Sequence, residues 1–162
     1  MPDEIIELDL GVIPEAAISG AVCLQTEVIT FLTFNAMRPT ARMSPYGGPY
    51  LENAGTAVIE FKRCIVSRFG YPNDEPRSGI PQYQSVDYGI YEVLNSTWIQ
   101  EVVRMNRYSF PKTQDDYVKR HFVFGFHDST FECLADDLDL QVTNEPFDVI
   151  FDRIKRRAIN GA

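Results

Sequence analysis

Histidine and cysteine are scarce in this 162-residue chain, and neither occurs in a spacing that binds a metal. The two histidines are His121 and His127, and the three cysteines are Cys23, Cys64 and Cys133. Without an HExxH, CxxC or EF-hand pattern, the sequence predicts no metal site. Walker, GxGxxG and GxSxG motifs are missing too, so no cofactor is predicted. The odd number of widely spaced cysteines indicates reduced thiols packed as small hydrophobic side chains.

Long apolar runs and an excess of basic residues are also missing. No apolar run approaches the roughly 20 residues that cross a bilayer, and the N-terminus carries acids where a secretory signal carries basic residues. The formal net charge is −8, which disfavours nucleic acid and anionic membranes as partners. We therefore expect a cytoplasmic chain that binds neither of them, and any protein partner is expected to be basic.

The residues that are present suit a single core. Hydrophobic residues make up 44% of the chain and aromatic residues 12%, and no internal repeat or linker divides it. A chain of this length buries enough surface to fold without disulfides. We predict one α+β domain, residues 1–162, built mainly on an antiparallel sheet.

Apolar periodicity gives the expected elements. Strands are predicted over Ala21–Phe34 and Ala57–Val66, and the stretch Ile5–Val12 suits either an edge strand or a short helix. Two packed helices are predicted at about 96–107 and 145–158, each with a capping residue before it. In the first helix, Trp98, Val102 and Met105, with Ile99 beside them, form an apolar stripe, and Trp98 is expected to lie in the core.

Two long irregular segments, Arg38–Gly55 and Gly70–Gly89, are predicted between these elements, and they hold five of the eight tyrosines. Long loops of this kind are often functional, and tyrosine offers a rigid amphipathic contact surface. The alternative is that the tyrosines only pin the loops to the domain. The residues proposed for binding are Tyr71, Asn73, Glu75, Tyr83, Tyr88, Asp128, Ser129 and Thr130.

A β-hairpin is predicted over His121–Ala135, with Asp128-Ser129 as a two-residue turn. That turn places Phe126 opposite Phe131 on a core face and puts His127 diagonal to Glu132 on the polar face. A histidine beside a carboxylate is the minimal general base, and Asp74 is a candidate further carboxylate. The alternative is that the tip residues serve turn geometry alone.

Three segments resemble an uncharacterised family of bacterial proteins. They are Phe69–Glu75 (FGYPNDE), Tyr88–Val93 with Asn95–Trp98 (YGIYEV and NSTW), and His121–Cys133 (HFVFGFHDSTFEC). The resemblance implies a bacterial origin and a common fold, and it implies no mechanism. It groups the second tyrosine-rich segment, the start of the first helix and the hairpin as one candidate surface.

Two functions follow from these patterns. The first is a protein-binding module of the immunity or inhibitor type that uses its Tyr- and Pro-rich loops. The second is a small hydrolase or isomerase-like enzyme with a His127/Glu132 acid–base pair. No catalytic set beyond that pair is present, so binding is the preferred prediction.

Overall fold

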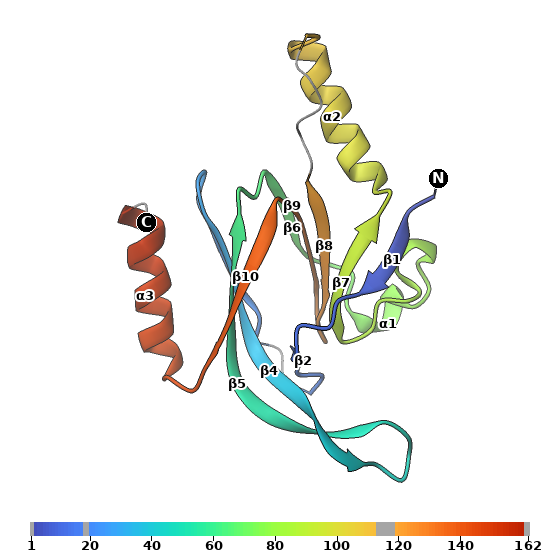
Figure 1. Ribbon diagram of the computed structural model, residues 1–162, viewed down its shortest axis with the longest axis vertical. Coiled ribbons are helices and arrows are strands. Elements are labelled where there is room, and N and C mark those ends of the chain that lie inside the picture. Colours follow the sequence, from blue (N-terminus) through green and yellow to red (C-terminus); the bar gives the residue numbers. More distant parts are fainter. Residues whose placement is uncertain (1, 18–19, 113–118, 161–162) are drawn as a thin grey trace.

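The computed structural model describes residues 2–17, 20–112 and 119–160, and it forms two antiparallel sheets that face each other (Figure 1). The first sheet has the strand order β1 (Glu4–Glu7), β7 (Gly89–Leu94), β8 (Arg120–Gly125), β9 (Thr130–Ala135) and β6 (Val66–Gly70). The second has the order β10 (Asp137–Thr143), β5 (Pro49–Lys62), β4 (Thr30–Met43) and β2 (Ile13–Pro14), with β3 (Val22–Gln25) also paired to β4. The predicted α+β fold with mainly antiparallel sheet is confirmed.

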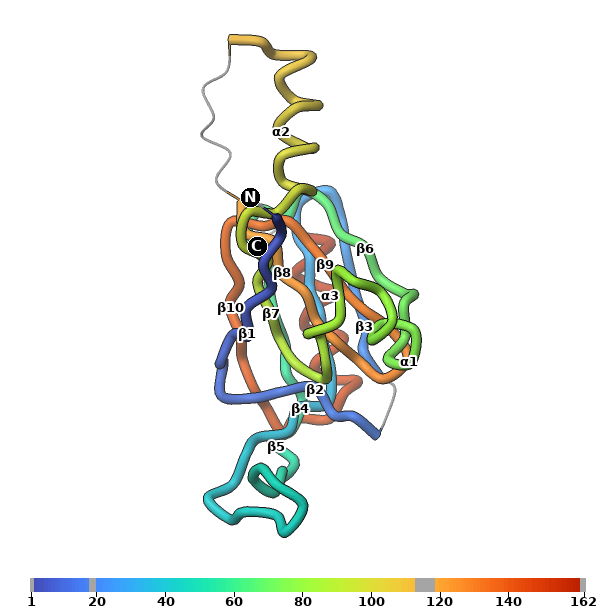
Figure 2. The backbone as a smooth tube through the Cα atoms, turned by 90° about the vertical axis from the view of Figure 1, so that its right-hand side faces the viewer, coloured from blue at the N-terminus to red at the C-terminus, as the bar shows by residue number. Residues whose placement is uncertain are grey.

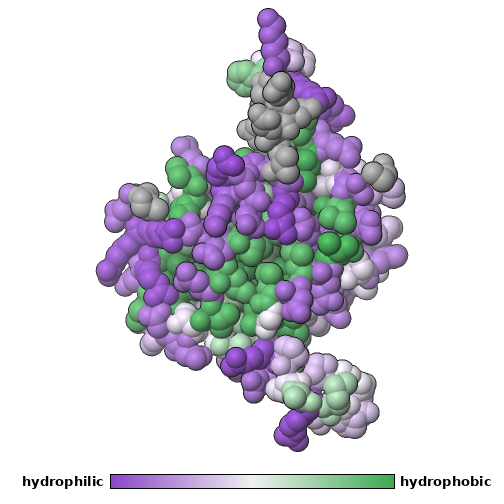
Figure 3. Space-filling model, viewed as in Figure 1, coloured by the Kyte–Doolittle hydropathy of each residue, from purple (hydrophilic) through white to green (hydrophobic). Residues whose placement is uncertain are grey.

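Phenylalanines from both sheets form the centre of the core. Phe61 of β5 contacts Phe122, Phe124 and Phe131, with ring centroids 5.3 to 6.0 Å apart. The alternation of β8 and β9 explains this, because every second residue of each strand points between the sheets. Figure 3 shows apolar side chains gathered in the middle of one face, over the opening between the two sheets.

Four helical elements complete the described chain: α1 (Asp74–Arg77), the short 3₁₀ helix η1 (Pro81–Tyr83), α2 (Thr97–Ser109) and α3 (Phe147–Asn160). Both longer helices agree with the prediction. Ile150 and Ile154 of α3 pack on Phe31 and Val58, so α3 covers the outer face of the second sheet. Among the described residues, no helix is both long and apolar enough to span a membrane.

Helix α2 departs from the expected packing. It projects from one end of the molecule, as Figures 1 and 2 both show, and none of its residues is buried. The prediction that Trp98 lies in the core is wrong, since its side chain is only half-buried. An amphipathic helix therefore stands with much of its apolar stripe outside the core.

Two strand predictions need correction. Ala21–Phe34 is a hairpin of β3 and β4, because Thr26 Oγ1 accepts hydrogen bonds from the backbone amides of Val28 and Ile29 and closes a turn. Ala57–Val66 ends early: β5 stops at Lys62, Arg63 adopts a positive φ of 47°, and the chain crosses to the first sheet as β6.

The predicted irregular segment Arg38–Gly55 is wrong as well. It is the outer part of the β4–β5 hairpin, paired as far as Met43 and Pro49 and turned at Gly47 and Gly48, which both have positive φ. This arm projects from the end of the molecule opposite α2 (Figure 2). A two-stranded ribbon tolerates proline because each strand keeps a free edge.

The second irregular segment is ordered against the first sheet. Residues 71–88, called here the 71–88 loop, bury Tyr83 and Val86 against Tyr91, Val93 and Val123 on the outer face of that sheet. The edge strand predicted as one alternative for the N-terminal stretch is confirmed by β1, which pairs with β7.

Candidate functional site

The hairpin of β8 and β9 is confirmed, but its predicted register is wrong by two residues. Gly125 pairs with Thr130 and Phe124 with Phe131, which leaves the four-residue loop 126–129. The amide of Phe126 donates to the carbonyl of Ser129 at 2.9 Å and closes that loop. A shift of two keeps each side chain on its predicted face, yet it changes every cross-strand neighbour.

The new register replaces His127 by His121 as the partner of Glu132. Val123 lies opposite Glu132 and His121 lies opposite Leu134, so His121 and Glu132 are diagonal neighbours on the outer face. His121 Nε2 lies 3.1 Å from Glu132 Oε2. Both side chains are 6% exposed.

Two further side chains complete this buried network, which we call the Glu132 network: Ser96, His121, Glu132 and Tyr83. Tyr83, held by the 71–88 loop, donates its hydroxyl hydrogen to Glu132 Oε1. Ser96 Oγ lies 2.8 Å from His121 Nδ1. Ser96 also caps α2, since its hydroxyl accepts the amide of Ile99 at 3.2 Å.

The surroundings of Glu132 favour its ionised form. Burial acts to raise its pKa, but hydrogen bonds from His121 and Tyr83, with the charges of His121 and Arg68, outweigh that effect and hold the pKa below its usual 4.5. Burial, and then the hydrogen bond to Glu132, raise the pKa of Tyr83 to about 12. At neutral pH the pair is a carboxylate and a protonated phenol.

A cleft of about 220 Å³ opens above this network. Its lining includes His121, Glu132 and Tyr83, together with Trp98 and Glu101 from the start of α2. The guanidinium of Arg68 lies over the Trp98 ring, 3.8 Å from its centroid. The cleft is therefore a polar hollow with an ionised carboxylate at its base and a cation at its side.

The order Ser96, His121, Glu132 has the connectivity of a hydrolytic triad, in which an acid orients a base and the base contacts a hydroxyl. The Glu132 network differs from such a triad because its serine is not accessible from the cleft. Ser96 is 3% exposed, its oxygen is engaged as the helix cap, and it is not among the residues that line the cleft. Proton exchange at His121 and Glu132 is sterically open from the cleft, whereas attack by Ser96 on a substrate there is not.

The predicted residues His127 and Asp74 form a second, separate cluster at the hairpin tip. His127 Nδ1 lies 2.9 Å from Asp74 Oδ2, and the hydroxyl of Tyr88 donates to the same oxygen at 2.5 Å. That hydrogen bond and the one from His127 lower the pKa of Asp74, and the Asp74 contact raises the pKa of Tyr88 to about 12. The 220 Å³ cleft is lined by neither His127 nor Asp74.

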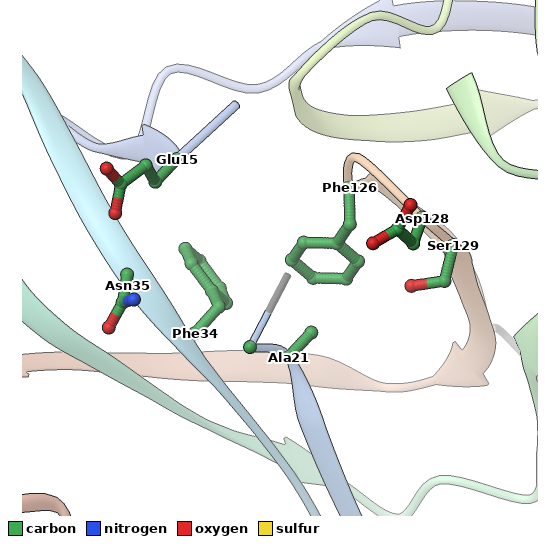
Figure 4. Close-up of a pocket in the computed structure, with 8 residues that line it drawn as sticks. Glu15, Ala21, Phe34, Asn35, Phe126, Asp128 and Ser129 are labelled. Atoms are coloured by element: carbon green, nitrogen blue, oxygen red, sulfur yellow. The ribbon is translucent and has the colours of Figure 1, made fainter. Parts of the chain in front are cut away.

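Among the other predicted binding residues, Thr130 and Ser129 attach the 71–88 loop to the hairpin tip. Thr130 donates its hydroxyl to the carbonyl of Pro72 at 2.7 Å, and the carbonyl of Ser129 accepts from Arg77. Within the loop, the backbone carbonyl of Asn73 accepts the amide of Arg77. Tyr71 and Glu75 are exposed. Asp128 and Ser129 line a crevice of about 80 Å³ with Phe34 and Phe126, shown in Figure 4. That crevice has room for a few water molecules only.

A larger groove of about 480 Å³ runs along α2 and shares Trp98 and Glu101 with the cleft. Its apolar lining comes from Ile65, Val66, Trp98, Val102, Met105 and Phe110. Met105 is 65% exposed and Phe110 62% exposed. Cleft and groove together make one continuous surface, which we call the α2 surface.

Sequence reasoning missed His121, Ser96 and Arg68 as members of a site. The available signal was parity, since His121, Glu132 and Arg68 all point to the outer face of the first sheet. The four-residue hairpin loop then makes His121 the diagonal neighbour of Glu132. Comparisons with family models, with curated proteins and with solved structures found no match to this chain. Geometry alone therefore bears on function.

Acid titration should show the stabilising role of ionised Glu132. Its folded-state pKa is lowered, so its contribution to the unfolding free energy is present above pH 4.5 and is lost as pH falls through the folded-state value. We expect Glu132→Gln to cost about 1–3 kcal/mol at pH 7 and the stabilities of the two proteins to converge as pH falls below 4.5 and through the lowered folded-state pKa. Urea unfolding across that range measures this. A constant offset would contradict it, and Glu52→Gln, in an exposed ion pair with Arg38, is the control.

Proposed function

We propose that this chain is a protein-binding domain that uses the α2 surface to hold a basic partner. The observation that carries the proposal is the apolar stripe of α2, which no described side chain buries. The cytoplasm of a bacterium is the setting that the sequence favours for it. The preference for binding is thus kept, and its surface moves from the tyrosine-rich loops to α2.

The stability of α2 supports a partner. A 13-residue helix is at the lower limit of what is stable alone in water, and helices in proteins gain most of their stability from packing an apolar face. The first turn of α2 contacts the body through Trp98, whose ring lies 5.2 Å from that of His121, and through Thr97, which donates to Asp3. A partner laid on Val102, Met105 and Phe110 would supply the missing packing.

Charge indicates the kind of partner. The chain carries a net charge of −8, and Asp3, Glu101 and Glu132 all line the cleft beside the groove. A protein that offers apolar side chains to the groove and a basic residue to the cleft complements both parts. A second copy of this chain matches the apolar part and repels at the charged part.

Site-specific cross-linking tests the proposal. In the cells of origin, Met105 is replaced by the photo-reactive residue p-benzoylphenylalanine, and so, separately, is Val28, which is 80% exposed in the β3–β4 turn. We expect an adduct with a basic protein from position 105 and none from position 28. The proposed attraction is partly electrostatic. The yield of the adduct should therefore fall when the cross-linking is done at high salt, and it should fall with Glu101→Lys.

Other outcomes contradict it. An adduct of twice the chain mass would indicate self-association, and an adduct confined to the chain itself would mean that its own residues cover the groove. Replacement of Tyr46, which is 97% exposed at the tip of the arm, by the same photo-reactive residue tests the original prediction that the tyrosine-rich segments bind a partner. Adducts from position 46 alone would move the proposal to that tip.

An acid–base enzyme is the second candidate, favoured by one observation: His121 and Glu132 both line a cleft. Here the pair would be His121 with Glu132, and His127 would pair with Asp74 instead. The Glu132 network already gives each oxygen of the carboxylate one hydrogen-bond partner, which suits a structural role. Any hydrolase or isomerase activity found should fall with His121→Gln and survive His127→Gln if this candidate is correct.

A further inference from the structure

The cleft beside the first turn of α2 already holds one cationic group, the guanidinium of Arg68. Its central carbon lies 3.8 Å from the centroid of the Trp98 ring, within the range of cation–π attraction. Its Nη2 lies 3.8 Å from Glu132 Oε2, which permits Coulomb attraction but is too long for a hydrogen bond. The Arg68 side chain is 57% exposed, so most of it remains in water.

Glu132 keeps acceptor positions that no described side chain fills at hydrogen-bond distance. Tyr83 donates to one of its oxygens and His121 contacts the other, whereas a carboxylate has about four acceptor positions. An ionised carboxylate at 5% exposure is costly unless a cation lies against it. A guanidinium that came within hydrogen-bond distance of Oε2 would satisfy Glu132 better than Arg68 does.

The remaining walls suit the same group. Among the described residues of the lining, Asp3, Glu101 and Glu132 are acidic, against Arg68 and His121. The volume of about 220 Å³ holds one side-chain head group with part of its aliphatic stem. A guanidinium also stacks flat on an indole ring while it hydrogen-bonds to a carboxylate, which an ammonium does less well.

We propose that this cleft is a subsite for an arginine side chain of the basic partner, whose guanidinium replaces that of Arg68 over Trp98 and hydrogen-bonds to Glu132. The inference rests on the proposed function, because the apolar groove opens directly beside the cleft. Arg68 is then an internal competitor, which occupies the subsite in the free chain and moves into water when the partner binds. While Arg68 occupies the subsite, the arginine of the partner cannot enter it. The apparent affinity for the partner therefore falls in proportion to the fraction of time that the subsite is free.

Trp98 reports directly on the subsite because it is the single tryptophan of the chain. The full-length chain is titrated at constant ionic strength with butylguanidinium, or with butylurea, which has nearly the same shape and no charge. We expect a saturable change of Trp98 fluorescence with butylguanidinium and none with butylurea. Arg68→Ala should bind butylguanidinium about tenfold more tightly, and Glu132→Gln about tenfold more weakly.

Arg38→Ala is the matched control, since it removes an exposed arginine on the arm and should titrate like the wild type. Equal affinity of wild type and Arg68→Ala, or equal responses to the two ligands, would overturn the subsite. If circular dichroism shows that Glu132→Gln is unfolded, the Arg68→Ala and butylurea comparisons still decide. Saturable butylguanidinium binding without a cross-link from position 105 would retain the subsite and reject the partner, and the reverse result would reject the subsite alone.

Discussion

Arg77→Met is expected to lower the unfolding free energy by about 3–5 kcal/mol, because it removes a buried donor that serves several acceptors. Arg77 is 1% exposed and joins the 71–88 loop to the hairpin tip. It donates to the carbonyls of Val86, Phe126 and Ser129 at 3.0 to 3.2 Å, and to Thr130 Oγ1 at 3.2 Å. Methionine fills similar space but donates no hydrogen bond. The Ser129 carbonyl keeps the amide of Phe126 as donor, whereas the other three acceptors lose the donor that Arg77 supplies and carry a desolvation cost.

Urea or thermal unfolding with circular dichroism measures the effect, and Arg38→Met is the control. Arg38 forms an ion pair with Glu52 in which both side chains are more than half exposed, so its loss should cost no more than about 1 kcal/mol. Arg77→Lys keeps the charge but has no planar fork to span four acceptors. It should retain only part of the stability. A loss below about 1 kcal/mol for Arg77→Met would show that the loop is held by other contacts.

Elements with strong local signals were predictable. The alternation in 121–135 and the capped, amphipathic patterns of the two longer helices gave β8, β9, α2 and α3 within a few residues. The turn at Thr26 was not predictable, because residues 22–34 have strand propensity throughout and a single hydroxyl closes the turn. Proline and glycine in the arm led to the prediction of a loop, because both residues are unfavourable in strands inside a sheet. In a two-stranded ribbon each strand has a free edge, so the same residues are tolerated.

The candidate site was harder to predict, because it depends on the length of one turn. With a two-residue loop, His127 is the diagonal neighbour of Glu132, and with the observed four-residue loop that neighbour is His121. Asp128 and Ser129 suit both loops. Contacts from distant segments, such as Tyr83 to Glu132 and Arg68 to Trp98, have no local signal at all.

The position of Trp98 outside the core was also beyond sequence reasoning. An apolar stripe on a helix predicts that something covers it, and it does not say whether the cover is the same chain or another one. In this chain α2 projects from one end of the body (Figures 1 and 2). The apolar stripe that contains Trp98 is thus the main support for the proposed binding function.

Gly125→Ala is the second substitution with a large expected effect, a loss of about 3 kcal/mol or more in unfolding free energy. A Cβ at this position would lie 1.9 Å from the carbonyl oxygen of Asp87 and 3.2 Å from Val86 Cγ1. Because the nearest atom belongs to the backbone, the 71–88 loop must move away from β8. That movement would also draw Tyr83 off Glu132, so the pKa of the Tyr83 phenol should fall from about 12 toward its ordinary value.

Gly79→Ala is the matched control in the same loop, since a Cβ there meets its nearest atom, the carbonyl oxygen of Pro76, at an ordinary 3.5 Å. Its unfolding free energy should stay within about 0.5 kcal/mol of the wild type. Denaturant unfolding gives the stability, and ultraviolet absorbance between pH 9 and 12 follows the tyrosines. If Gly125→Ala lost stability and left the tyrosine titration unchanged, the loop would yield near Asp87 without disturbing Tyr83. The close backbone contact at Gly125 and the Glu132 network would then be independent, although one loop supplies both.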